Sequence, residues 1–169
     1  ANIDIAPSTI DGWAAQGMDA LKPLYTRLVG LIKNQDYLQV DETTIKVLDE
    51  MKKGKTHLGY YWTYHAPKSK LVLFDYNPGR AGKYSEPFLG EFKGYLQVDG
   101  FSSYLRYGQN SDITTLSCWA HARREFEKAL SNDKVRATHV LLQIQQLYAL
   151  ERKAVEQNMT TEQIKEQRL

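Results

Sequence analysis

Apolar residues recur early in the chain with the three- and four-residue spacing of an amphipathic helix. This pattern runs from Met18 to Ile32, and side chains at such spacing share one helical face. A capping signal at Ser8 predicts a short helix before it, and Gly17 predicts where that helix ends. Pro23 predicts a kink or the first turn of the second helix. We therefore expect two helices before the first strand.

From residue 36 the pattern changes to the two-residue alternation of β-strands. In the first strand, 36–48, Leu38 and Val40 fall on one face, and Gln39 and Asp41 fall on the other. Further strands are expected at 58–65, 71–74, 95–99 and 114–118. The first three strands are joined by short turns, which makes them antiparallel neighbours.

The order of elements predicts the fold class. Helices are expected at 82–91, 120–130 and 134–157, and Gly100 with Ser102-Ser103-Tyr104 is expected to begin a turn followed by a helix. Three antiparallel strands, a helix, a strand, a helix, a strand and further helices follow the order of the ribonuclease H-like fold. This α/β fold has a mixed five-stranded sheet with flanking helices, and a right-handed crossover brings its fourth strand beside the first. We divide the chain into a helical lead-in, 1–35, and a ribonuclease H-like core, 36–169.

Two aspartates end the strands that this fold places side by side. Asp41 and Asp99 each close the same Leu-Gln-Val-Asp string. Carboxylates brought together in this way suit Mg²⁺, which takes one or two protein carboxylates with water and phosphate oxygens. Aspartate at a strand end is also a common turn residue. On spacing alone, both interpretations stay open.

Composition narrows the class of protein without assigning a function. The 169 residues are 42% hydrophobic and 25% charged, with a net charge of +2 that does not by itself indicate nucleic-acid binding. The single cysteine, Cys118, allows no internal disulfide and fits a reducing, cytoplasmic location. No segment has the roughly 18 continuous apolar residues of a membrane span. The start at Ala1 and a helix signal at Thr160, close to the last residue, lead us to expect a fragment of a longer protein.

Three sequence strings resemble successive signatures of the insertion-sequence-66 family of bacterial DDE transposases. They are Val40-Asp41-Glu42-Thr43, the stretch from Phe92 to Phe101, and Cys118-Trp119-Ala120-His121-Ala122-Arg123-Arg124-Glu125-Phe126. The stretch from Leu147 to Glu151 is also similar to a segment of that family. The resemblance implies a ribonuclease H-like catalytic core with two bound Mg²⁺ or Mn²⁺ ions held by Asp41 and Asp99. It also implies cleavage and joining of double-stranded transposon-end and target DNA by a homo-oligomer.

The chain departs from that family at the third acidic residue. The family carries it in a later Asp-Asn-Asn-x-x-Glu-Arg segment, and these 169 residues contain none. We therefore expect a core truncated before its third carboxylate and at best weakly active alone. The rival interpretation takes Glu125 or Glu127, on the helix after the fifth strand, as that carboxylate.

Basic residues near the expected dyad are candidate DNA contacts. His121, Arg123 and Arg124 open the helix after the fifth strand, and arginines there suit bidentate phosphate contacts. A solvated helix face explains them equally well. Arg80 follows the third strand and is a further candidate, although loop arginines are commonly just exposed. The basic turn with Lys52, Lys53 and Lys55 suits non-specific phosphate contact or solubility.

Three functions compete on these observations. The first is the catalytic core of a DNA transposase. The second is a non-catalytic DNA-binding or assembly module on the same fold, which needs no metal. The third is a self-contained metal-dependent nuclease that uses Glu125. The first requires the first and fourth strands to be neighbours, so that Asp41 and Asp99 share a cation.

Overall fold

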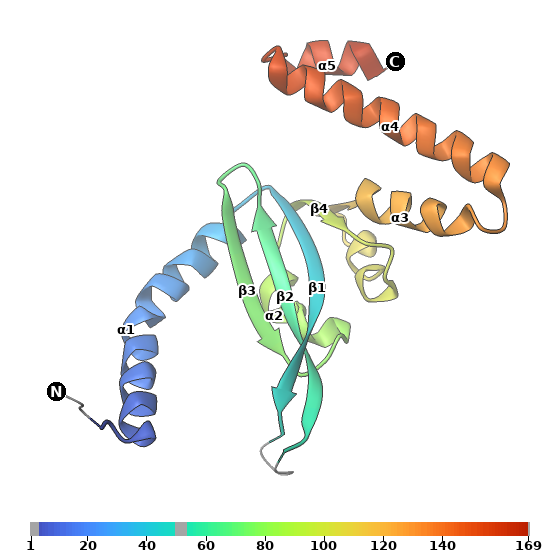
Figure 1. The fold of residues 1–169 in the computed structure, drawn as a ribbon. Coiled ribbons are helices and arrows are strands. Elements are labelled where there is room, and N and C mark those ends of the chain that lie inside the picture. Colours follow the sequence, from blue (N-terminus) through green and yellow to red (C-terminus); the bar gives the residue numbers. More distant parts are fainter. Residues whose placement is uncertain (1–3, 50–53, 169) are drawn as a thin grey trace. The chain divides into compact units, whose positions relative to one another are not determined.

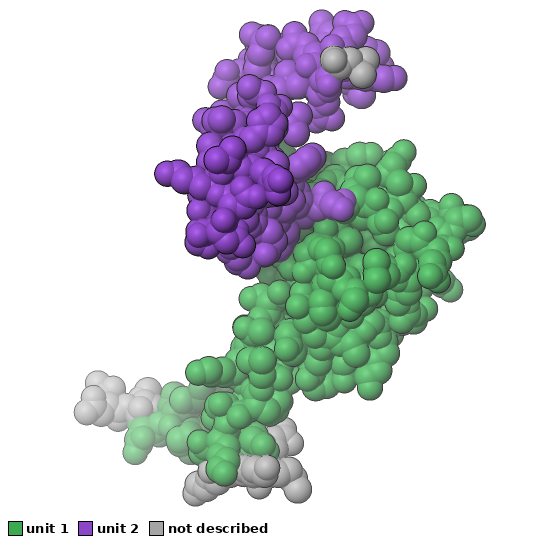
Figure 2. Space-filling model, turned by 90° about the vertical axis from the view of Figure 1, so that its right-hand side faces the viewer, with its two compact units in different colours: residues 1–116 green, residues 117–169 purple. Residues whose placement is uncertain are grey.

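The structure is a computed structural model that describes residues 4–49 and 54–168. The chain divides into two compact units, Ala1–Leu116 and Ser117–Leu169 (Figure 2), and each is described by itself. The predicted domain boundary at residue 35 remains a prediction. Lys52 and Lys53 of the predicted basic turn lie outside the described residues.

A mixed five-stranded sheet organises the first unit. Its strands are β1 (Tyr37–Leu48), β2 (Thr56–Ala66), β3 (Leu71–Asn77), β4 (Gly94–Val98) and β5 (Ile113–Ser117). They lie in the order β3-β2-β1-β4-β5. The β1–β2 and β2–β3 pairs are antiparallel, and β1 and β4 are parallel (Figure 1). The predicted ribonuclease H-like α/β fold, with its first and fourth strands adjacent, is therefore confirmed.

The parallel pairing of β1 with β4 places the two Leu-Gln-Val-Asp strings side by side, residue for residue. Leu38 pairs with Leu96 and Gln39 with Gln97, an offset of 58 residues in both pairs. The same offset, carried two residues further, relates Asp41 to Asp99. Side chains alternate between the faces of a strand, so Asp41 belongs to the face of Gln39, and Asp99 follows the last residue of β4 directly.

A glycine at the start of β4 makes this pairing possible. Gly94 has a φ of +129°, and a Cβ added there would lie 2.3 Å from the carbonyl oxygen of Asp36. The neighbouring backbone is tied down, because Gly94 N–H donates to Asp112 O at 2.8 Å and Tyr95 N–H donates to Asp36 O at 2.9 Å. A side chain at position 94 would therefore separate the start of β4 from the segment that leads into β1.

The hydrophobic core lies on the opposite face of β1 from Asp41. Its buried strand residues include Leu38, Val40, Trp62, Tyr64, Ala66, Leu73, Leu96, Val98 and Ile113. Side chains from the connections complete it, among them Phe88 and Leu89 of α2 (Glu86–Leu89). Tyr64 stacks on Phe88 with ring centroids 3.8 Å apart. The core thus fixes β1 and β4 from one side.

The lead-in is one helix, not two. Helix α1 (Pro7–Lys33) runs through Gly17 and Pro23, and its N-cap is Ala6, without a side-chain cap. The prediction of a Ser8 cap and a break at Gly17 was wrong. A glycine costs about 1 kcal/mol relative to alanine inside a helix, which the surrounding helical hydrogen bonds outweigh. Only the end of α1 packs on the core, through Leu28, Val29 and Ile32.

Short 3₁₀ helices complete the connections of the first unit. They are Gly82–Tyr84, Ser102–Tyr104 and Tyr107–Gln109. The second unit contains α3 (Trp119–Ala129), α4 (Lys134–Glu156) and α5 (Thr161–Arg168). Thr160 and Gln163 form the predicted reciprocal cap of α5, at 2.8 and 3.3 Å. Within residues 4–49 and 54–168, no helix combines the length and apolar character that a membrane crossing needs.

The constraint at Gly94 generates a stability prediction. Gly94→Ala should lower the free energy of unfolding of the first unit by about 2 kcal/mol or more, because alanine meets both a positive φ and a backbone clash. Urea denaturation followed by tryptophan fluorescence measures this change, since Trp62 is fully buried. Gly12→Ala is the control, because Gly12 lies in α1 with nothing within 4 Å of an added Cβ. Equal stabilities of the two variants would contradict the constraint.

Candidate metal centre

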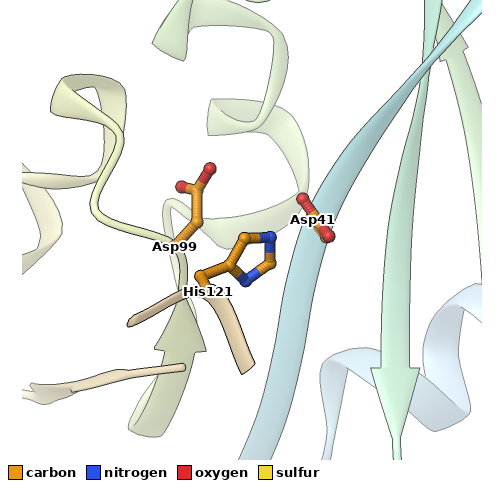
Figure 3. Close-up of side chains that lie close together, drawn as sticks. All are labelled: Asp41, Asp99 and His121. Atoms are coloured by element: carbon orange, nitrogen blue, oxygen red, sulfur yellow. The ribbon is translucent and has the colours of Figure 1, made fainter. Parts of the chain in front are cut away.

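Asp41 and Asp99 come together at one end of the parallel strand pair. Asp41 lies in β1, and Asp99 follows the last residue of β4 directly. Figure 3 shows Asp41 projecting from β1 and Asp99 from the segment after β4. A carboxylate oxygen of one lies within 4.8 Å of a carboxylate oxygen of the other. The third residue drawn there, His121, belongs to α3 and is described with the second unit.

The two carboxylates differ in how they are held. Asp41 is exposed, and its Oδ1 accepts a hydrogen bond from the Glu42 N–H at 2.9 Å. Asp99 has a side chain only 15% exposed. Its Oδ1 accepts from the Phe101 N–H at 3.0 Å, and its Oδ2 accepts from Arg80 Nη2 at 2.9 Å. Both oxygens of Asp99 are therefore fixed by neighbours.

Glu42 is a buried carboxylate behind this pair. Its side chain has no exposed surface. Arg80 donates to Oε2 through Nε at 3.0 Å and approaches it with Nη2 at 2.9 Å, while the Tyr104 hydroxyl donates to Oε1. Burial raises the pKa of Glu42, and the hydrogen bonds from Tyr104 and Arg80 oppose that rise. All these partners are donors, which suits the ionised form.

Glu42 was not predicted as a site residue from the sequence. It shares the inward face of β1 with Leu38 and Val40. A carboxylate on that face needs a cation and hydrogen-bond donors within the protein. The two-residue alternation of β1 places Glu42 on the same face as Leu38 and Val40, and this pattern could have indicated a buried carboxylate.

Arg80 connects the buried carboxylate to the candidate metal ligand. Its guanidinium carbon lies 3.8 Å from the centre of the Phe101 ring. Partial burial acts to lower the pKa of Arg80, but the hydrogen bond and charge of Glu42, with the charge of Asp99, raise it above its ordinary value. The residue is therefore a permanent cation between two carboxylates.

The loop that carries Arg80 is anchored through its backbone. Ser103 Oγ donates to the Arg80 carbonyl at 3.2 Å, and Trp62 Nε1 donates to the Gly79 carbonyl at 3.3 Å. Trp62 is fully buried in the sheet core. The position of the guanidinium therefore depends on the core as well as on its ion pairs.

The donor set fits a hard divalent cation. Asp41 and Asp99 offer only carboxylate oxygens, the ligands that Mg²⁺ and Mn²⁺ prefer. Opposite ligands of one Mg²⁺ lie about 4 Å apart, given metal–oxygen distances of about 2.1 Å. Carboxylate oxygens within 4.8 Å of each other lie close to this span.

The remaining predicted site residues lie on α3 in the second unit. His121, half-buried, belongs to the first turn of that helix. Arg123 and Arg124 are exposed, and Arg123 Nη2 lies 2.8 Å from Glu127 Oε1. Arg123 also lines a hollow of about 440 Å³ with Leu141, Gln145, Tyr148 and Arg152 of α4. Two arginines on one hollow make it a basic surface.

Glu125 lies on the same helix. It is exposed to solvent, and Lys128 Nζ donates to its Oε1 at 2.7 Å. This hydrogen bond lowers the pKa of Glu125, with the charge of Lys128 acting in the same direction. A role for Glu125 as third carboxylate stays a prediction.

Comparison with known families decides the class of protein. The family model described as "Transposase IS66 family" matches residues 1–169. The chain belongs to this family. The membership agrees with the strings around Asp41, Asp99 and His121 that first indicated it.

Curated relatives of this IS66-family chain come from Sinorhizobium fredii (strain NBRC 101917 / NGR234). Uncharacterized protein y4jD is 27% identical over 164 residues, which cover 89% of this chain and 32% of the relative. Uncharacterized protein y4qI is also 27% identical over 164 residues, with 88% and 30% covered. The chain thus spans about a third of the length of these relatives.

A similar solved structure is a chain of the simian T-cell lymphotropic virus intasome in complex with PP2A regulatory subunit B56 gamma. The sequences are 15% identical, the match covers 63% of this chain and 46% of that chain, and the TM-score is 0.33. The fold class of the IS66-family chain follows from its own strand order and pairing.

The hydroxyl of Tyr104 generates a prediction about the buried carboxylate. Tyr104→Phe should lower the free energy of unfolding by about 2 kcal/mol, because it removes one donor from a fully buried ionised group. Chemical denaturation monitored by circular dichroism measures the change. Tyr95→Phe is the matched control, since the Tyr95 side chain is exposed. A similar small effect in both variants would show that the Tyr104 hydroxyl does not stabilise Glu42.

Proposed function

We propose that this chain supplies the first two catalytic carboxylates, Asp41 and Asp99, of a DDE-type DNA transposase. The observation that carries the proposal is the approach of these carboxylates to within 4.8 Å from neighbouring parallel strands. Membership of the IS66 transposase family supports the reaction class. The reaction is cleavage of DNA strands at the transposon ends and their transfer to target DNA.

The roles of the residues follow from their charge and position. Asp41 and Asp99 would hold Mg²⁺ or Mn²⁺, which would supply activation of the attacking oxygen and stabilisation of the leaving oxygen of the phosphodiester, and two ions are expected in the complete enzyme. Asp41 and Asp99 contribute oxygen ligands and two negative charges. Asp41 lies in β1 and Asp99 follows β4 directly, and sites built on strands are held more precisely than sites on loops.

The third carboxylate belongs, on this proposal, to a part of the protein outside these 169 residues. The span of about a third of the relatives' length leaves room for it. Glu125 is the rival within the chain. The two alternatives differ in whether these 169 residues alone cut DNA.

DNA is the proposed partner of the basic residues. Arg123 and Arg124, with His121 near them on α3, would contact backbone phosphates, and Arg152 adds positive charge to the hollow beside Arg123. For Arg80 a DNA contact remains a prediction. Assembly of several copies on the DNA ends is part of the proposal, as is a cytoplasmic location.

Removal of either aspartate tests the proposed metal centre. Asp41→Asn and Asp99→Asn should each reduce Mn²⁺ affinity beyond detection, because one carboxylate of the pair is lost. Isothermal titration calorimetry measures the affinity, and plasmid nicking by the full-length protein measures activity. Asp112→Asn is the control, because Asp112 is an exposed carboxylate paired with Lys93.

The outcomes separate the three candidate functions. Normal Mn²⁺ affinity in both aspartate variants would contradict the metal centre. DNA binding that survives both substitutions and needs no metal would favour the non-catalytic module. Nicking by these 169 residues alone that is lost in Glu125→Gln would favour the self-contained nuclease.

Salt dependence tests the proposed DNA contacts. For B-DNA, each phosphate contact contributes about −0.9 to the slope of log K against log salt. Arg123→Gln and Arg124→Gln should each reduce the magnitude of that slope by about this amount, measured by fluorescence anisotropy on duplex DNA. Arg136→Gln, at an exposed arginine of α4 paired with Asp133, is the control. An unchanged slope in both α3 variants would exclude them as phosphate contacts.

A further inference from the structure

We infer that Arg80 is a positioning residue for metal binding, which holds the carboxylate of Asp99 while the buried Glu42 balances its charge. The inference rests on the proposed function, because it concerns the same metal centre. It assigns Arg80 and Glu42 a joint role that differs from contact with DNA.

A single guanidinium nitrogen contacts both carboxylates. Arg80 Nη2 lies 2.9 Å from Glu42 Oε2 and 2.9 Å from Asp99 Oδ2. Nη2 donates a hydrogen bond to Asp99 Oδ2, and Nε donates one to Glu42 Oε2 at 3.0 Å. The planar guanidinium is pre-organised for such a fork, so it fixes direction as well as distance.

The orientation of Asp99 depends on this fork. The Phe101 N–H holds Oδ1 at 3.0 Å, and Arg80 holds Oδ2. With one donor on each oxygen, the carboxylate cannot rotate about its last bond without breaking a hydrogen bond. Each oxygen has two lone pairs, so one donor on each still leaves acceptor capacity for a metal ligand bond.

The charge of Glu42 determines whether Arg80 orients the Asp99 carboxylate or competes with the metal cation for it. An arginine beside a metal ligand can weaken metal binding by repelling the cation. Here the fully buried Glu42 matches the charge of Arg80 one for one, so the pair adds no net charge. Asp41 and Asp99 keep their two formal negative charges for the metal, and Arg80 contributes geometry.

The surroundings show that Arg80 is held independently of any metal. The Phe101 ring lies under the guanidinium, Tyr104 occupies the other oxygen of Glu42, and Ser103 holds the Arg80 backbone. A guanidinium restrained in this way can orient Asp99 before a cation arrives. Residues that orient metal ligands typically change metal affinity by about 10–100-fold when they are substituted.

The test is calorimetric titration of the full-length protein with Mn²⁺ alone, without DNA. Arg80→Gln should weaken Mn²⁺ binding by about tenfold or more. Arg80→Lys keeps a charge for Glu42 but cannot form the fork, so its affinity should stay below that of the wild type. Glu42→Gln leaves the charge of Arg80 unbalanced and should also weaken binding. Circular dichroism selects the variants that are folded.

Arg106→Gln is the matched control. Like Arg80, Arg106 pairs with a carboxylate, Glu86, and lies near an aromatic ring, Tyr107, in the first unit. It has no described contact with Asp41 or Asp99, and its substitution should leave Mn²⁺ affinity unchanged. A general loss of stability would affect this variant as well.

The outcomes are distinct. Equal or tighter Mn²⁺ binding by folded Arg80→Gln or Arg80→Lys protein would overturn the positioning role, and tighter binding would make Arg80 a competitor of the metal. Wild-type protein that binds no Mn²⁺ would instead remove the proposed metal centre itself. Weaker binding in the Arg80 and Glu42 variants, with a normal Arg106 variant, supports the inference.

Discussion

The parallel pairing of β1 with β4 is the constraint on which the candidate site depends. It aligns Leu38 with Leu96 and Gln39 with Gln97, so that two identical strings end level with each other. A slip of one residue would turn the aspartate of one strand toward the core. The contact of Gly94 with the Asp36 backbone and the burial of Leu38 and Leu96 both oppose such a slip.

This alignment creates an electrostatic problem that the fold also solves. Asp41, Glu42 and Asp99 gather three carboxylates in a small volume, and like charges at such distances disfavour ionisation. One of the three, Glu42, is buried, and it accepts hydrogen bonds from Arg80 and Tyr104. The buried ion pair therefore belongs to the architecture of the site, although it gives little net stability over an apolar pair.

The sequence predicted the features that depend on local pattern and element order. The five strands, the adjacency of the first and fourth, and the meeting of Asp41 with Asp99 follow from alternation, short turns and one crossover. The pairing of Glu42 with Arg80 did not follow, because the two residues are 38 positions apart and meet only after β3 and its loop have folded. The continuity of α1 was also missed, since a single glycine costs too little to end a long helix.

Asp41 and Asp99 differ in hydrogen bonding and exposure, which suggests different roles for them in the proposed site. Asp99 has both oxygens hydrogen-bonded and little exposure, whereas Asp41 is exposed. The proposed metal centre, which would also admit a DNA phosphate, needs one ligand of fixed direction and solvent access on its other side. Asp99 meets the first need because Arg80 and the Phe101 backbone hold it. Asp41 meets the second because it lies on the face of the sheet that the core does not cover.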